Sequence, residues 1–318
     1  MNPLVTVVAL CYNHARFVNE SVESVMRQTY SNLQLILVDD ASKDDSQAVI
    51  RALAVKHPQI QIILLNQNVG NCRAFNLAWK EARGKYIIDF ATDDVMMPDR
   101  IEKQVKMFES LGPEYGIVFT DSEYIDENGQ SIANHYERLF KQRIIHEVPE
   151  GDVFRNVLTR YFISGPTMMV RSEVMQVLNG YDETLSFEDF DFWVRSSRVF
   201  QYKFLNERLT QVRKWRQSMS TGWYKSGDKQ LHSVYLVCCK AKDLCRNEDD
   251  KKALVVRLAY EHRQALFSEN KKEAKLFEDL LRNMNAWRLQ QKWWKVLSTL
   301  PLPWAKIRMM YHKIYFGA

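Results

Sequence analysis

The 318-residue sequence predicts an α/β fold, a mainly parallel sheet flanked by helices and followed by an α-helical C-terminal region. Over residues 1–120, short apolar runs alternate with amphipathic stretches at helical spacing. After Asp228 the pattern changes to long helical stretches without strand signals. We therefore expect a first domain over residues 1–227 and a helical region over residues 228–318.

Each predicted strand is an apolar run that is too short for an amphipathic helix. Five occur in the first part of the chain, at Leu4–Leu10, Gln34–Val38, Ile60–Leu65, Tyr86–Phe90 and Gly116–Thr120. The helices expected between them are Arg16–Gln28, Asp44–Lys56, Asn71–Ala82 and Arg100–Leu111. A further strand is expected at Thr167–Val170, and a short helix ending near Arg195. Residues 123–150 carry weak signals, and we expect them to form an excursion outside the central sheet.

Composition places the chain among ordinary globular proteins, with 46% hydrophobic and 26% charged residues. Its five cysteines are odd in number and form no CxxC pair, so neither a disulfide framework nor a structural zinc site is favoured. No basic segment precedes the first apolar run, and no run of about 18 apolar residues occurs. These features predict a cytoplasmic protein.

The C-terminal tail is basic and aromatic. From Arg282 onward there are seven Lys or Arg and no Asp or Glu, although the net charge of the whole chain is only +5. Apolar residues recur there at spacings of 3 and 4, at Ala286, Leu289, Trp293, Val296, Leu297, Leu300, Trp304, Ile307, Tyr311 and Ile314. Two interpretations remain open. The tail lies on an anionic membrane surface, peripheral on the inner face of the cell membrane, or it packs on the chain itself or on a second subunit of a homo-oligomer. No recognised nucleic-acid-binding motif occurs, so no nucleic acid partner is expected.

Polar residues follow several predicted strands, where ligands of open α/β sheets bind. They form the segments Cys11-Tyr12-Asn13, Asp39-Asp40-Ala41-Ser42 and Thr92-Asp93-Asp94, and the pair Glu188-Asp189 occurs further along. Neither GxGxxG nor GxxxxGK[ST] is present, so a dinucleotide fingerprint and a P-loop are not predicted. Carboxylates at strand ends suit Mg²⁺ or Mn²⁺ bound together with substrate phosphates. The sequence therefore favours a nucleoside diphosphate held through a divalent cation.

Three ordered blocks together cover most of residues 4–195, and they read VTVVALCYNHARFVNESVESVMRQTYSNLQLILVDDASKDDS, NVGNCRAFNLAWKEARGKYIIDFATDDVMMPDR and GPTMMVRSEVMQVLNGYDETLSFEDFDFWVR. These blocks resemble family 2 glycosyltransferases of the GT-A fold. The resemblance implies an inverting transfer of a sugar, from a nucleoside diphosphate sugar (a UDP-sugar favoured) to a hydroxyl of a saccharide or lipid-linked acceptor. It also implies a hexosyltransferase-type enzyme of cell-surface polysaccharide or glycolipid synthesis.

On the donor side, the resemblance implies that Tyr12 and Asp40 hold the nucleotide base, with Asp40 accepting from a ring N–H. The alternative for Asp40 is a turn or helix N-cap carboxylate. TDD resembles the family's metal motif, with Ala91 where its first Asp is usual. Either Asp93 or Asp94 is then the Mn²⁺ or Mg²⁺ ligand, with Asp93 also near the nucleotide. The alternative is an exposed turn.

On the acceptor side, Glu188-Asp189 matches the family's ED motif, which implies that Asp189 is the catalytic base and Glu188 its neighbour in the catalytic pair. The alternative is that Glu188, Asp189 and Asp191 supply negative charge to the first turn of a helix. Both can hold at once. Phe190 is expected to pack in the core, as are Phe192 and Trp193.

Four further residues lie where the family approaches the donor. Arg73 is a candidate nucleotide-binding residue, and Asn76 shares its segment, although a solvated helix face accounts for both. Arg213 and Arg216 occupy the place of a basic motif that could contact the diphosphate, but the His common in that motif is absent.

Two other functions are weighed against this one. A metal-dependent nucleotidyltransferase also places carboxylates at strand ends, but it needs a Gly-rich basic loop, and Ala9–Arg16 contains no Gly. A non-catalytic nucleotide-sugar binding protein would fit the substitution at Ala91. The presence of Asp189 argues against it.

Overall fold

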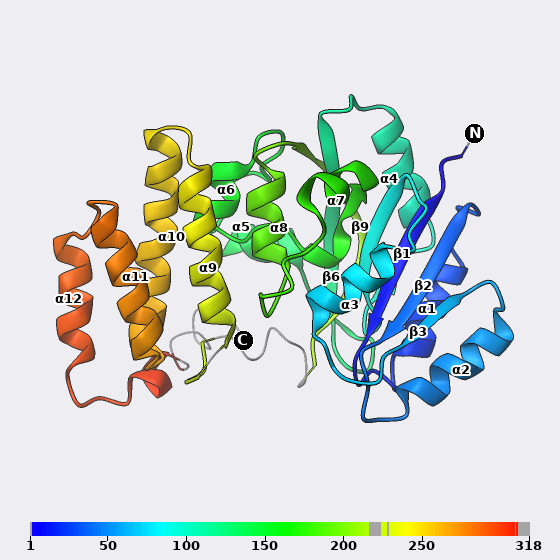
Figure 1. Ribbon diagram of the computed structural model, residues 1–318, viewed down its shortest axis with the longest axis horizontal. Helices are drawn as coiled ribbons and strands as arrows, with labels where there is room; N and C mark the ends of the chain where they lie inside the picture. Colours follow the sequence, from blue (N-terminus) through cyan, green and yellow to red (C-terminus); the bar gives the residue numbers. More distant parts are fainter. Residues whose placement is uncertain (1, 216–223, 228, 309, 311–318) are drawn as a thin grey trace. The chain divides into compact units, whose positions relative to one another are not determined.

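The computed structural model describes residues 2–215, 224–227, 229–308 and 310, and it divides into two compact units (Figure 1). The first unit comprises Met1–Val153 and Phe162–Trp215, and the second comprises Phe154–Tyr161 and Arg216–Ala318. The division falls at Trp215, before the residue 227 proposed from sequence. A short segment from the middle of the chain also joins the helical unit.

The first unit is built on a mixed sheet whose order, in the described residues, is β3-β2-β1-β4-β8-β6-β9-β5, with β7 beside β6. The mutually parallel strands are β1 (Val5–Cys11), β2 (Leu33–Asp39), β3 (Gln61–Leu64) and β4 (Tyr86–Ala91). The other strands are β5 (Val95–Met96), β6 (Tyr115–Ile125), β7 (Ser131–Asn134), β8 (Met169–Arg171) and β9 (Gln201–Arg213). β8 is antiparallel to both β4 and β6, while β6 and β9 are parallel.

Helices flank this sheet, which confirms the predicted α/β class. They are α1 (Val18–Met26), α2 (Ser46–Lys56), α3 (Asn71–Trp79), α4 (Arg100–Glu109), α5 (His135–Lys141), α7 (Ser172–Leu178) and α8 (Asp189–Ser196), with a 3₁₀ turn η1 at Gly165–Thr167. The prediction for residues 123–150 is wrong in part. β6 extends to Ile125, and β7 pairs with it as an antiparallel strand.

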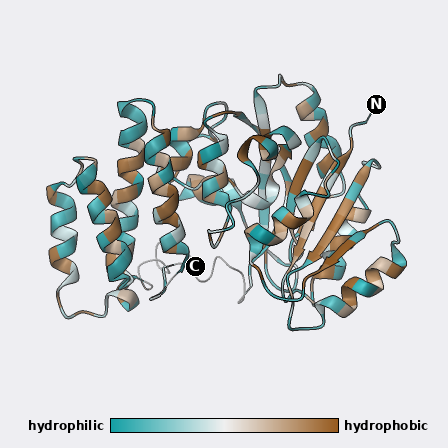
Figure 2. Cartoon of the chain, in the orientation of Figure 1, coloured by the Kyte–Doolittle hydropathy of each residue, from teal (hydrophilic) through white to brown (hydrophobic). Residues whose placement is uncertain are grey.

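The core lies around β1, β2 and β4, whose residues are mostly apolar (Figure 2). Val7, Leu37 and Ile88 are fully buried, one from each strand. The ring of Tyr86 stacks on that of Phe108 with centroids 4.6 Å apart. Each such side chain contributes about 1.5–3 kcal/mol on burial. This rigid core fixes where the three strands end, and so fixes the polar residues that follow them.

The second unit consists of α6 (Phe154–Thr159), α9 (Lys229–Leu244), α10 (Glu248–Phe267), α11 (Lys271–Asn283) and α12 (Leu289–Ser298). Arg257 explains why α6 belongs here: its Nε donates to the carbonyl of Leu158 at 2.8 Å, and its Nη1 contacts Glu261 Oε1 at 3.1 Å. Both members of this ion pair are buried. None of the helices that the structure describes is long and apolar enough to cross a membrane.

Candidate active site

The ends of β1, β2 and β4 meet at one edge of the sheet. Cys11 stands opposite Asp39 in the β1–β2 register, and Leu10 stands opposite Ala91 in the β1–β4 register. The Asp40 N–H donates to the Cys11 carbonyl at 2.9 Å, which continues the pairing one residue beyond β2. Tyr12 follows β1 directly and is 39% exposed, so its ring is open to a ligand.

Asp40 is buried and holds the loop between β3 and α3. Its Oδ1 accepts from the Val69 N–H at 2.7 Å, and its Oδ2 accepts from the Gly70 N–H and from Asn68 Nδ2, both at 2.9 Å. Burial raises the pKa of Asp40, and the two backbone N–H groups oppose that rise. α2 begins only at Ser46, so Asp40 is not its N-cap.

The neighbouring carboxylate, Asp39, is fully buried and has local partners. Its Oδ1 accepts from the Ser42 N–H at 3.0 Å and from Gln47 Nε2 at 2.8 Å. Just beyond the strands, Asn13 and Ala41 adopt positive φ angles of 59° and 57°. Such angles are uncommon outside glycine and are often found where a ligand site constrains the backbone.

Asp93 and Asp94 lie beyond β4 and are both buried. Asp93 Oδ2 accepts from Trp215 Nε1 at 2.9 Å and lies 3.9 Å from His14 Nε2. Asp94 Oδ1 accepts from the Arg213 N–H at 2.8 Å. Burial, and then the charge of Asp93, raises the pKa of Asp94 well above its usual value.

Asp93 and Asp94 fit a divalent cation whose other ligands come from outside the protein. Within the described part of the chain, Asp93 Oδ1 and Asp94 Oδ2 have no hydrogen-bond partner. Two adjacent buried carboxylates repel each other, and a bound cation relieves that repulsion. No group of three or more His, Cys, Asp or Glu among the described residues is arranged to hold a metal. The remaining ligands would therefore come from water and phosphate, which is common for Mg²⁺.

Arg213 is occupied by internal partners. Its Nε donates to the Asp93 carbonyl at 2.8 Å, its Nη1 to the Asp126 carbonyl at 3.1 Å, and its Nη2 contacts Glu20 Oε2 at 2.7 Å. Its side chain also lies over the Phe17 ring at 4.6 Å. This arrangement does not favour the diphosphate contact considered from sequence. Arg216 lies outside the described residues.

Glu188 and Asp189 lie at the start of α8. Glu188 Oε2 accepts from Asn71 Nδ2, whereas Asp189 makes no side-chain hydrogen bond within the described residues. Burial, and then the charge of Glu188, raises the pKa of Asp189 well above its usual value, and Lys214 opposes the rise. A Cβ added to Gly165 would lie 2.3 Å from Asp189 Oδ1, so a side chain at this position would displace the carboxylate.

The first-turn interpretation of these acids also holds, most clearly for Asp191. Asp189 and Asp191 both lie in the first turn of α8, where the helix dipole favours negative charge. Asp191 is fully buried and pairs with Arg195 Nε at 2.7 Å. Arg195 in turn donates to the carbonyls of Leu178 and Gly180. Asp191 therefore has a structural role. The expected core packing of its neighbours is confirmed, since all are buried: Phe190, Phe192 and Trp193.

The loop at the start of α3 contacts both Asp40 and Glu188. Asp40 accepts from the backbone of Val69 and Gly70, and the next residue, Asn71, donates to Glu188. Gly70 has a φ of +87°, which suits glycine and permits this turn. Sequence analysis did not identify Asn71, although it follows that Gly inside a quoted block.

Lys214 is a second residue that sequence analysis missed. Its Nζ lies 4.7 Å from the centre of the Tyr124 ring and makes no ion pair or hydrogen bond with any described residue. Burial lowers its pKa, against the charges of Asp94, Asp93 and Asp189. Its charge therefore acts on Asp93 and Asp94 and also on Asp189. Lys214 is next to Arg213, so the basic motif identified the correct segment of the chain but not Lys214 itself.

Arg73 and Asn76 differ, although both lie on α3. Arg73 is exposed, with its Nε 3.7 Å from Glu183 Oε2. Asn76 is only 5% exposed; its Nδ2 donates to the Tyr181 carbonyl at 2.8 Å and its Oδ1 accepts the Tyr181 N–H at 2.9 Å. The expectation of a solvated face is thus wrong for Asn76, which fixes the segment before α8.

Comparison with known proteins places the chain in a family. The family model described as Glycosyl transferase family 2 matches residues 6–174, more than half of the chain. The chain belongs to glycosyl transferase family 2. EpsE of Bacillus subtilis is 31% identical over 245 residues, which are 76% of this chain and 84% of that protein. The family and the glycosyltransferase class predicted from sequence are confirmed.

Other relatives are longer than the part that matches this chain. An uncharacterised glycosyltransferase of Rickettsia prowazekii is 29% identical over 215 residues, which are 67% of this chain but 64% of that protein. Chondroitin synthase of Escherichia coli is 27% identical over 206 residues, which are 64% of this chain and 28% of that protein. The chain thus spans less than two thirds of either of these relatives.

Solved structures confirm the fold. S. aureus TarS in complex with UDP-GlcNAc has a TM-score of 0.66 at 15% identity, covering 88% of this chain and 80% of TarS. The mannosyltransferase PcManGT of Pyrobaculum calidifontis, in complex with GDP-Man and Mn²⁺, has a TM-score of 0.62 at 16% identity, covering 100% of this chain and 86% of PcManGT. The chain therefore has the predicted GT-A type architecture.

Proposed function

We propose that this family 2 glycosyltransferase is an inverting enzyme that moves a sugar from a nucleoside diphosphate sugar to a hydroxyl acceptor. The observation that carries the proposal is the state of Asp189. It is a carboxylate with a raised pKa and without a hydrogen-bonding partner among the described residues, beside a loop that also contacts Asp40. A raised pKa makes the ionised carboxylate a stronger base, which suits it to accept a proton.

In the proposed reaction, Asp189 takes the proton of the acceptor hydroxyl as its oxygen attacks the anomeric carbon. The bond from that carbon to the diphosphate breaks, and its electron pair leaves with the diphosphate. Attack opposite the leaving group inverts the configuration. A divalent cation, Mn²⁺ or Mg²⁺, held by Asp93 and Asp94 would neutralise the departing diphosphate. Lys214 adds positive charge to the same region.

We assign the donor base to Tyr12 and Asp40, and we keep Arg73 as a candidate contact with the nucleotide. A carboxylate offers about four lone-pair sites, and three of those of Asp40 are occupied. Oδ1 carries only the Val69 bond, so it retains one acceptor site for a ring N–H. The complexes of TarS with UDP-GlcNAc and of PcManGT with GDP-Man support a nucleoside diphosphate sugar. We favour a UDP-sugar.

The acceptor is proposed to be a saccharide or a lipid-linked saccharide in the synthesis of a cell-surface polysaccharide or glycolipid. The similarity to chondroitin synthase supports a polysaccharide product. The proposed location is the cytoplasmic face of the cell membrane, where the basic C-terminal segment would meet anionic lipid.

The donor site is tested by thermal stabilisation with UDP, GDP, ADP, CDP and TDP, because a ligand that binds only the native state raises its apparent stability. We expect the largest shift for UDP with Mn²⁺ and its loss with a chelator. The double substitution Asp93→Asn with Asp94→Asn should abolish the dependence on metal. Asp40→Ala should weaken binding by about tenfold in calorimetry.

Asp99→Asn is the matched control, because Asp99 is a surface carboxylate that pairs with Lys103 just after this segment. It should bind nucleotide as the wild type does. Unchanged affinity in both the Asp40 variant and the double variant, measured on protein with native circular dichroism, would reject the assignment of the donor site.

A further inference from the structure

The solvent-facing side of α12 is apolar. Leu289, Trp293, Val296 and Leu300 follow one another at spacings of 4, 3 and 4, so they share one face of the helix and of the turn after it. They are 68%, 60%, 60% and 47% exposed, respectively. We call these four residues the α12 stripe.

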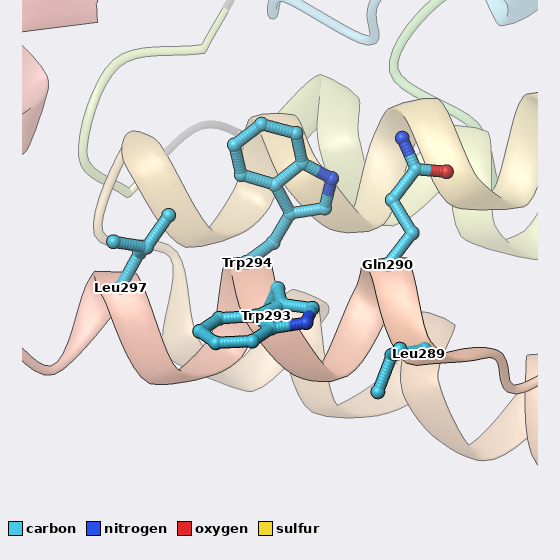
Figure 3. A pocket seen from close by; sticks show the side chains of 5 residues that line it. All are labelled: Leu289, Gln290, Trp293, Trp294 and Leu297. Atoms are coloured by element: carbon cyan, nitrogen blue, oxygen red, sulfur yellow. The ribbon is translucent and has the colours of Figure 1, made fainter.

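The side of α12 that faces the protein is the more polar one. Gln291 is 4% exposed and lies about 200° around the helix from Leu289, opposite the stripe. Next to it, Lys295 Nζ contacts Glu278 Oε2 at 2.8 Å. Figure 3 shows Trp293 and Trp294 pointing to different sides of the helix. A surface helix of a globular protein usually turns its apolar side to the core, so α12 departs from that rule.

The four tryptophans of the tail separate into two groups. Trp287 packs on His262 with ring centroids 5.1 Å apart, and Trp294 and Trp304 pack on Phe267 at 5.7 and 4.8 Å. Trp293 alone among them is mostly exposed. The packing interpretation of the tail therefore accounts for three tryptophans and leaves the stripe without a described partner.

The charge around the stripe is of one sign. Arg288 and Lys292 are exposed on α12 or beside it. The sequence contains no Asp or Glu after Asp279, whereas it contains seven Lys or Arg there. Two copies of such a surface would repel each other, while an anionic surface would attract it. An amphipathic helix with Trp and Leu on one face and Lys or Arg around them suits a membrane interface.

We propose that the α12 stripe inserts into an anionic lipid bilayer, with the axis of α12 in the plane of the interface. Trp293 and its apolar neighbours enter the boundary between headgroups and acyl chains, and Arg288 and Lys292 contact the lipid phosphates. The inference concerns the helical unit alone, and its test does not depend on the transfer reaction.

The test is sedimentation of the full-length protein with vesicles of phosphatidylcholine, alone or with about one third phosphatidylserine. The wild type should sediment with the mixed vesicles and much less with the neutral ones. Trp293→Glu with Val296→Glu should weaken this binding by about tenfold or more. The matched control is Val55→Glu with Val177→Glu, which adds the same charges at positions that are 85% and 54% exposed. The control should bind as the wild type does.

Trp293→Phe gives a second measurement that misfolding does not mimic. With brominated lipids, the fluorescence of the wild type should be quenched, and the variant should still sediment while losing most of the quenching. Equal vesicle binding by the stripe variant and the control would overturn the proposal, as would equal binding to neutral vesicles. A dimer in light scattering that only the stripe substitutions dissociate, without vesicle binding, would assign the stripe to a second copy instead.

Discussion

The carboxylates on the two sides of the candidate site share a property and differ in their partners. Burial raises the pKa of both Asp40 and Asp189. Asp40 accepts three hydrogen bonds and fixes a loop, whereas Asp189 has no hydrogen-bonding partner within the described residues. A carboxylate with several donors around it is held in place and positions other groups. A carboxylate without hydrogen-bond donors is a stronger base, because no hydrogen bond stabilises its ionised form.

The same contrast separates two adjacent cations. The guanidinium of Arg213 contacts Asp93, Asp126 and Glu20. Lys214 makes no ion pair in the described structure and lies over an aromatic ring. Arg213 thus holds the end of β9 against the loop after β4, and Lys214 remains able to respond to a substrate. Adjacent residues of like charge have different roles because successive side chains of an extended segment point to opposite sides.

The largest effect is expected from Asp189→Asn. The substitution keeps the volume but cannot take the proton, so transfer should fall by roughly 10²–10⁴-fold. Donor affinity should stay close to that of the wild type. Single-turnover transfer and calorimetry on the same protein separate the two quantities.

Glu188→Gln is the companion variant and should cost less, because Glu188 is held by Asn71 and acts on Asp189 through its charge. Near-normal transfer by Asp189→Asn would indicate that Glu188 is the base, since Asp191 forms an ion pair with Arg195. Loss of both transfer and donor affinity would make Asp189 chiefly structural.

A smaller effect is expected from Gly165→Ala. The new Cβ would displace the carboxylate of Asp189, and a shift of about 1 Å at a reacting group can lower the rate by about 10²-fold. Nucleotide affinity, measured by calorimetry, should not change. The control is Gly129→Asn, at a turn where nothing lies near the added atoms and where Asn tolerates the positive φ. Full activity in Gly165→Ala would show that Asp189 need not stay where the structure has it.

The smallest effect is expected from Lys214→Met and appears in the pH profile of transfer. Transfer needs ionised Asp189, and the ammonium of Lys214 lowers the pKa of that carboxyl. Without it the pKa rises further, so activity should be lost at a higher pH as the solution is acidified. On the acidic side of the pH profile we expect the variant to transfer up to about tenfold more slowly than the wild type. This difference should shrink as the pH rises.

Lys203→Met is the control, because Lys203 lies on β9, the strand that Lys214 directly follows, and pairs with Glu150. Its profile should follow the wild type. An acid limb that moves to lower pH in Lys214→Met would show that Lys214 does not support the ionised form of Asp189.

The sequence by itself determined the central strands and the residues that end them. β1, β2 and β4 are short, mostly apolar runs that are largely buried on both faces, and such runs are recognisable without knowledge of their partners. Once the strands are parallel, their carboxyl ends must meet, so the proximity of Tyr12, Asp40 and Asp93 follows. α8 and its acidic first turn could be predicted for a similar reason, because capping and charge preferences act within one turn.

Only the tertiary structure decided the partners of these residues. β9 escaped prediction because its 13 residues mix polar and apolar positions, and its pairing with β6 joins segments far apart in sequence. The bond between Asn71 and Glu188 spans 117 residues, and the close approach of Gly165 to Asp189 has no local signal. Whether a buried carboxylate meets donors or none depends on which distant backbone reaches it, and local propensity does not encode that. The same holds for the tail, where one pattern of tryptophans yields three packed rings and an exposed Trp293.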